Sequence, residues 1–206
     1  MSLITVQKTL ARIYTDSKLR DDFLANPDVV GRSLGLNCEE ILQLSKLSSQ
    51  EVNLFASSLK YKRLGEIRKL LPLSSKVLGK EFNSLFFKYS EAYLPTGNRK
   101  HLADAIAFLE FMSDLQSGWI LDVLRYEKNR LKMLSVKSLF ICDRFKYNMR
   151  SIIDNLQETN FTSKLQPQLT IVIWFRLSLR HRWRCLFLSF PNLPFIFTNK
   201  TLAARS

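Results

Sequence analysis

Residues 60–112 constrain the fold more than any other stretch, because their apolar side chains recur at helical spacing on both sides of a polar turn. The run from about residue 74 to residue 94 carries a wide apolar stripe, and the run from residue 100 to residue 112 carries another. Between them, Pro-Thr-Gly-Asn at 95–98 has the composition of a turn. We therefore expect two helices there, preceded by a helix that Pro72 interrupts.

Short helices are predicted on the amino-terminal side of this stretch. Asp16 and Asn37 stand where helix-capping residues are expected, and Pro27 suits the first turn of a helix that ends at Gly35. A further helix is predicted at about 116–133. Clusters of this kind include helix-turn-helix folds, but nothing in the sequence marks one helix as a recognition helix.

The pattern changes after Ser135. Residues 136–145 have an extended pattern, and 147–157 have the spacing of a short helix. Residues 169–177 are rich in β-branched and aromatic side chains, and 182–190 are the expected hairpin partner across Ser178–His181. The predicted fold is mainly α with a small α+β carboxy-terminal part that contains a short antiparallel sheet. The predicted domains are a helical domain at 1–134, a small basic α+β domain at 135–192 and a flexible tail at 193–206.

The positive charge is concentrated in the second part of the chain. The 206 residues carry a formal net charge of +13. Residues 1–120 contain 16 basic and 13 acidic residues, whereas residues 121–206 contain 15 basic and 5 acidic ones. This asymmetry favours an anionic partner, such as nucleic acid, an acidic peptide or protein, or anionic lipid. A generally basic, solvated surface is the plainer explanation.

The cysteines and apolar runs indicate a cytoplasmic protein. Cys38, Cys142 and Cys185 are far apart and form no CxxC pair, which suits a reducing compartment. No apolar run is long enough to span a bilayer, and the first residues lack the apolar core of a signal peptide.

The sequence contains no recognisable catalytic or metal-binding constellation. His101 and His181 are the only histidines, and arginines surround His181 in the sequence. No HExxH, GxSxG, Walker or GxGxxG pattern is present. We therefore predict that the protein is not an enzyme and uses no cofactor.

A cluster of arginines around Trp183 is the strongest functional feature. Strand alternation would bring Arg176, Arg182 and Arg184 to one face, where guanidinium groups bind carboxylates or phosphates in forked pairs. A second basic group occupies the run that begins at Lys60. The alternative for the arginine cluster is a solvated sheet face whose arginines protect a strand edge from aggregation, and the alternative for the second group is a solvated helix face. The candidate binding residues are Arg176, Arg180, Arg182, Trp183, Arg184, Lys60, Lys62 and Arg63.

Three runs in the central region resemble a family of bacterial proteins described as DNA-binding domains. They are RLGEIRKLLPLSSKVLGKEF at 63–82, LFFKYSEAYLP at 85–95 and KHLADAIAFLEFM at 100–112, and the likeness extends over about residues 5–190. Some relatives in that family are non-catalytic partners of multinuclear iron oxidases that modify ribosomally made peptides. The resemblance implies an adaptor role and assigns no functional residue.

The leading hypothesis is a non-catalytic adaptor that binds an acidic peptide or a partner protein, such as an iron-dependent oxidase, through the basic carboxy-terminal sheet. The alternative is a DNA-binding transcriptional regulator that uses the same charge. Attachment to a membrane surface, with Trp183, Phe187 and Phe190 inserted, ranks third because no amphipathic helix accompanies them.

Overall fold

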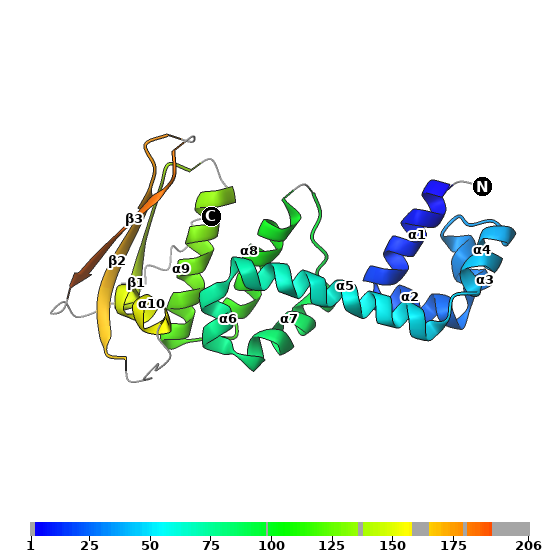
Figure 1. Ribbon diagram of the computed structural model, residues 1–206, viewed down its shortest axis with the longest axis horizontal. Helices are drawn as coiled ribbons and strands as arrows, with labels where there is room; N and C mark the ends of the chain where they lie inside the picture. The colour runs from blue at the N-terminus through cyan, green and yellow to red at the C-terminus, as the bar shows by residue number, and fades with distance from the viewer. Residues whose placement is uncertain (1–2, 98, 136–137, 158–164, 179–180, 191–206) are drawn as a thin grey trace, which may run out of the picture. The chain divides into compact units, whose positions relative to one another are not determined.

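The computed structural model describes residues 3–97, 99–135, 138–157, 165–178 and 181–190 (Figure 1). The chain divides into two compact units. Unit 1 consists of residues up to Leu70 together with Lys80–Asp104, and unit 2 consists of Leu71–Gly79 together with the residues from Ala105 onward. The predicted boundary lay near residue 134, whereas residues 123–133 of the last long helix share one buried core with the strands of unit 2.

The regular secondary structure in the described part of unit 1 is helical, and side chains define several of its helix starts. Its helices are α1 (Leu3–Thr15), α2 (Ser17–Ala25), α3 (Pro27–Ser33), α4 (Cys38–Ser45), α5 (Ser49–Leu70), α7 (Lys80–Ala92) and the start of α8 (Lys100–Ser113). The carboxylate of Asp16 accepts a hydrogen bond from the Leu19 amide, and Asn37 and Glu40 form a reciprocal capping box. Pro27 occupies the first turn of α3. The predictions for these three residues are confirmed.

The helix expected from about residue 74 to residue 94 is two helices. Helix α6 (Pro72–Leu78) ends at Gly79, and α7 begins at Lys80. Gly79 has a φ of 53° and a ψ of −120°, a backbone conformation that is unfavourable for residues with a side chain. The apolar spacing continues across this break, so periodicity alone predicted one helix. The prediction was wrong because it could not detect the backbone conformation at Gly79.

Unit 2 combines helices with a three-stranded antiparallel sheet in the order β1-β2-β3. It contains α6, the end of α8, α9 (Gly118–Ser135), β1 (Phe140–Tyr147), α10 (Met149–Gln157), β2 (Pro167–Phe175) and β3 (Arg184–Phe190). Figure 1 shows α9 and α10 against one face of the sheet. The predicted fold class, mainly α with a short antiparallel sheet at the carboxy-terminal end, is confirmed.

The two faces of the sheet have different environments. The inner face carries Val172 and Trp174, which are fully buried against Tyr126 of α9 and Ile152 of α10. The alternate residues of each strand point the other way, because strand side chains alternate between faces. We call the following nine residues, in three rows across β1, β2 and β3, the outer face: Phe140, Phe175 and Arg184; Cys142, Ile173 and Leu186; Arg144, Ile171 and Leu188.

A buried glutamate fixes the position of α6 within unit 2. The Glu127 carboxylate of α9 accepts hydrogen bonds from the Leu73 amide at 3.0 Å, the Ser74 amide at 2.9 Å and the Ser74 hydroxyl at 2.5 Å. These donors lie in the first turn of α6, where backbone amides have no partner within the helix. Glu127 thus caps a short helix from a distant part of the sequence.

Among the residues that the structure describes, no helix combines the length and the apolar character needed to cross a membrane.

Candidate functional site

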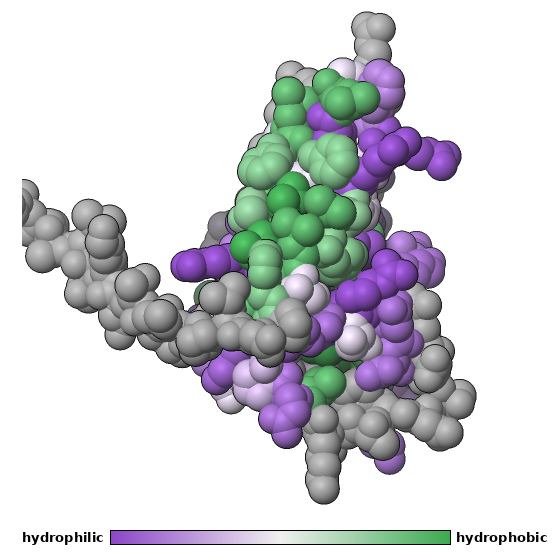
Figure 2. Space-filling model, turned by 90° about the vertical axis from the view of Figure 1, so that its left-hand side faces the viewer, coloured by the Kyte–Doolittle hydropathy of each residue, from purple (hydrophilic) through white to green (hydrophobic). Residues whose placement is uncertain are grey.

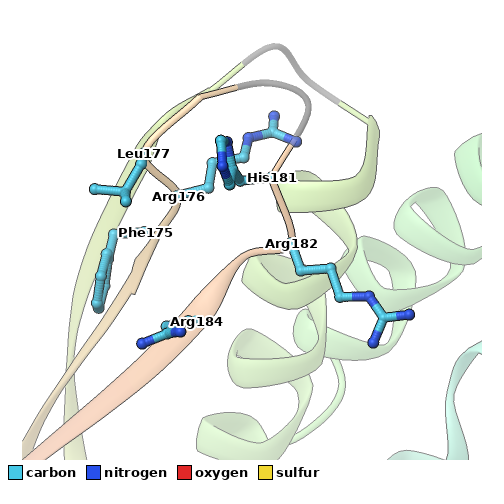
Figure 3. Close-up of a pocket in the computed structure, with 6 residues that line it drawn as sticks. All are labelled: Phe175, Arg176, Leu177, His181, Arg182 and Arg184. Atoms are coloured by element: carbon cyan, nitrogen blue, oxygen red, sulfur yellow. The ribbon is translucent and has the colours of Figure 1, made fainter.

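A hollow of about 510 Å³ lies at the end of the sheet where β2 leads toward β3 (Figure 3). Three arginines, one histidine and two apolar side chains line it: Arg176, Arg182, Arg184, His181, Phe175 and Leu177. These lining residues include no carboxylate. The hollow therefore offers guanidinium donors beside an apolar surface, which suits a carboxylate or a phosphate attached to an apolar group.

Strand register and one side-chain hydrogen bond position two of the arginines. Arg184 pairs with Phe175 across β3 and β2, so their side chains belong to the same face of the sheet. Arg176 follows β2, and its Nε donates a hydrogen bond to the Ser138 carbonyl at 2.8 Å. The guanidinium of Arg176 is thereby held against the segment that precedes β1.

The three arginines line one hollow without sharing one strand face. Strand β3 begins at Arg184 and not at Arg182, so strand alternation does not govern both residues. Figure 3 shows Arg182 and Arg184 extending in opposite directions from the chain. The three charges that line the hollow thus do not form a single row.

Trp183, one of the predicted binding residues, is not among the residues that line the hollow. It is half-buried and packs against the core that contains Tyr126 and Trp174. Its indole therefore fixes the chain between the exposed Arg182 and Arg184. Arg180, which the sequence assigned to the same cluster, lies outside the described residues.

His181 is held by the turn that precedes β3. Its Nδ1 lies 2.6 Å from the Ser178 hydroxyl, and its backbone amide donates to the Ser178 carbonyl at 3.1 Å. A serine and a histidine in contact can serve as nucleophile and base when a third group orients the histidine. Here both contacts join residues three positions apart, so they close a turn.

The second predicted basic group lies in unit 1 and is divided among different environments. Arg63 of α5 forms a forked pair with Asp104, through Nε to Oδ2 at 2.7 Å and Nη2 to Oδ1 at 2.6 Å. The Tyr89 hydroxyl donates to the same carboxylate at 2.9 Å, and burial together with the Asp104 charge raises the pKa of Tyr89. Arg63 therefore neutralises a buried carboxylate and stabilises unit 1.

The two lysines of that group line separate hollows. Lys62 borders one of about 510 Å³ together with Lys100 and His101, whereas Lys60 borders a small one of about 50 Å³. Glu66 also lines the larger hollow, and it forms an ion pair with Lys69. This group is less uniformly positive than the hollow in unit 2.

Sequence reasoning missed the apolar half of the site. Phe175, Leu177 and His181 line the hollow, and Figure 2 shows apolar side chains gathered over the sheet with hydrophilic ones on either side. Leu186 and Leu188 of the outer face are 47% and 39% exposed. The signal in the sequence is the unbroken apolar run at 185–188, which places apolar side chains on both faces of β3 but does not say which face is covered.

No protein-family model matches the chain, and a search of curated proteins gives no match.

Proposed function

We propose that this protein is a non-catalytic adaptor that binds an acidic peptide, or an acidic segment of a partner protein, through the hollow beside β2 and β3. The observation that carries the proposal is the lining of that hollow: three arginines surround an apolar surface, and no carboxylate is among the lining residues. Guanidinium groups remain charged throughout the physiological pH range and form forked hydrogen bonds with carboxylates.

The proposal favours an acidic peptide over nucleic acid because the charges are few and lie beside apolar side chains. Phosphate-backbone binding uses a stripe of cations along the duplex, whereas the sheet presents arginines beside a surface of leucine, isoleucine and phenylalanine. The resemblance to partners of peptide-modifying iron oxidases supports the same role, with a precursor peptide or the oxidase as the partner. The proposal also places the protein in the cytoplasm, since Cys38, Cys142 and Cys185 are all free thiols.

The test is a fluorescence-anisotropy titration with a labelled peptide of glutamate and leucine residues. Removing two guanidinium groups through Arg182→Ser and Arg184→Ser should weaken binding by about tenfold to a hundredfold, because each charge-assisted hydrogen bond contributes roughly 1.5–3 kcal/mol before screening.

The matched control is the double variant Arg12→Ser and Arg32→Ser. It removes the same charge from exposed positions in α1 and α3, and neither residue borders the hollow. Equal losses in the two double variants would show that only net charge matters, and the proposal would then be rejected. Tight binding of duplex DNA that displaces the peptide would favour the regulator instead.

A further inference from the structure

The outer face of the sheet is an apolar surface that continues into the arginine-lined hollow. Phe175 and Arg184 belong to both, because they form the row of the outer face nearest the turn. At the opposite end of the same face, Ile171 lies between Arg144 on β1 and Leu188 on β3. None of the described helices that bury the inner face reaches this side, where Phe140, Leu186 and Leu188 are exposed. An antiparallel sheet usually presents polar side chains on its solvent face, so this apolar face indicates a partner.

The charges on the outer face occupy opposite corners. Arg144 lies in β1 at one end, and Arg184 lies in β3 at the other, with two strand spacings and four residues between them. Ideal strand geometry places their Cα atoms about 17 Å apart. The other diagonal runs from Phe140 through Ile173 to Leu188 and is apolar. The surface is therefore an apolar diagonal with one arginine on each flank.

We infer that the outer face docks an amphipathic α-helix whose apolar stripe has acidic residues on both flanks. A helix is about 10–12 Å wide with its side chains, so acidic side chains on its two flanks can reach both Arg144 and Arg184. Its apolar side would cover the diagonal, as helices cover the faces of sheets in layered folds. This inference rests on the proposed function, and it specifies the form of the acidic partner.

A second copy of the chain fits this surface less well. The only carboxylate in the described strands is Asp143, which lies on the inner face and is bound by Arg125 and Asn129. Two outer faces packed together would bury arginines without a carboxylate from either copy, and unpaired buried charges are costly. The charge on this face thus favours a partner that brings acidic residues.

The test compares three fluorescein-labelled peptides of about 18 residues, a length that forms about 27 Å of helix. One has leucines along one helical face and glutamates on both flanks, one has the same composition in scrambled order, and one has lysines in place of the glutamates. The first should bind the full-length protein at least about tenfold more tightly than either of the others.

The double variant Leu186→Thr and Leu188→Thr removes apolar surface from β3 and keeps strand propensity, since threonine is β-branched. It should weaken binding of the first peptide by about tenfold, because burying a leucine side chain contributes appreciably to affinity. The control Leu42→Gln and Leu54→Gln changes two exposed leucines of α4 and α5 and should leave affinity unchanged.

Two cysteines provide an independent readout. Cys142 lies in the middle row of the outer face, on the edge strand β1, and is exposed, and Cys38 is exposed in unit 1. The first peptide should protect Cys142 from alkylation and leave the reaction of Cys38 unchanged. If Cys142 does not react before peptide is added, the face is already covered and the inference fails.

The outcomes separate this inference from the proposed function. The ordered and scrambled acidic peptides could bind with equal affinity, and only the Arg182 and Arg184 variant could lose binding. That result would reject the helical form of the partner and would still support an acidic partner. Failure of every acidic peptide to bind would overturn both. A wild-type dimer in sedimentation that the Leu186 and Leu188 variant converts to a monomer would identify a second copy as the occupant and overturn the inference.

Discussion

Asp104 is fully buried and receives hydrogen bonds from Arg63 and Tyr89, so its carboxylate is a structural group. The Arg63 guanidinium also lies 5.4 Å from the Phe86 ring centroid and 5.6 Å from that of Tyr89. Removing the charge of Asp104 would leave a largely buried cation with only neutral partners. A buried charge without an opposite charge beside it is one of the causes of the largest stability losses that single substitutions produce.

We expect Asp104→Asn to lower the free energy of unfolding by about 3 kcal/mol. Urea denaturation measures the change. Asp154→Asn is the control, because Asp154 pairs with Arg150 on an exposed helix face and its loss should cost no more than about 0.5 kcal/mol. Similar losses in both variants would show that the buried pair has no special role.

The three thiols should differ in reactivity. Burial raises the pKa of Cys185 to about 11, whereas Cys38 and Cys142 are exposed. At pH 8 the thiolate fraction of Cys185 is on the order of a hundredfold below that of an ordinary cysteine, and the thiolate is the reactive form. Alkylation followed by mass spectrometry should therefore modify Cys38 and Cys142 first. Early modification of Cys185 would contradict its position on the inner face.

At the scale of elements, Glu127 joins α9 to the first turn of α6. Glu127→Gln retains the size of the side chain and loses one of two acceptor oxygens, which leaves donors of Leu73 or Ser74 without a partner. We expect the free energy of unfolding to fall by about 2 kcal/mol and the amides in the first turn of α6 to exchange faster with solvent.

The matched control for Glu127 is Glu110→Gln. Glu110 pairs with Lys128 and is 56% exposed, so its substitution should cost no more than about 0.5 kcal/mol. Unchanged exchange of the Leu73 and Ser74 amides in Glu127→Gln would contradict the capping role.

Replacing each of two glycines by alanine should change the stability of the protein in opposite directions. Gly65 lies inside α5, and an added Cβ meets no atom within 4 Å, so Gly65→Ala should stabilise the protein by about 1 kcal/mol. Gly79 has a positive φ, so Gly79→Ala should destabilise it by about 1–2 kcal/mol. Thermal unfolding of both variants provides the comparison, and a shared sign would contradict the backbone assignment.

Local signals predicted the elements well where one side chain determines an end. Asp16 and Asn37 cap their helices through contacts three residues away, which a sequence shows directly. The break at Gly79 was missed because a backbone torsion leaves no mark in an apolar pattern. The start of β3 was placed two residues early, and this error produced the prediction that Arg182 and Arg184 share a face.

The site was predictable in its charge and not in its apolar half. Three of the arginines named from the sequence line the hollow, because nearness along a hairpin is enough to bring them together. The outer face was missed, since the apolar run of β2 has the same composition whether helices cover one face or both. Which face α9 and α10 cover is decided by tertiary packing, which a single sequence does not reveal.

At the scale of the whole molecule, the net charge of +13 would attract any polyanion. Net charge alone therefore does not distinguish an acidic peptide from a nucleic acid. The proposed adaptor uses few arginines beside an apolar surface. Burial of that surface would contribute much of its affinity for an acidic amphipathic peptide, and salt does not screen this contribution. Binding to a nucleic-acid backbone depends on counterion release and falls steeply with salt.

The most direct test is the salt dependence of affinity for the acidic amphipathic peptide and for a DNA duplex, measured side by side by anisotropy. We expect the peptide to bind more tightly at about 0.15 M salt and to lose affinity with a shallow slope, whereas DNA binding weakens steeply in the log–log plot. Tighter binding of the duplex, with a peptide slope as steep as that of DNA, would contradict the adaptor and favour a nucleic-acid-binding protein.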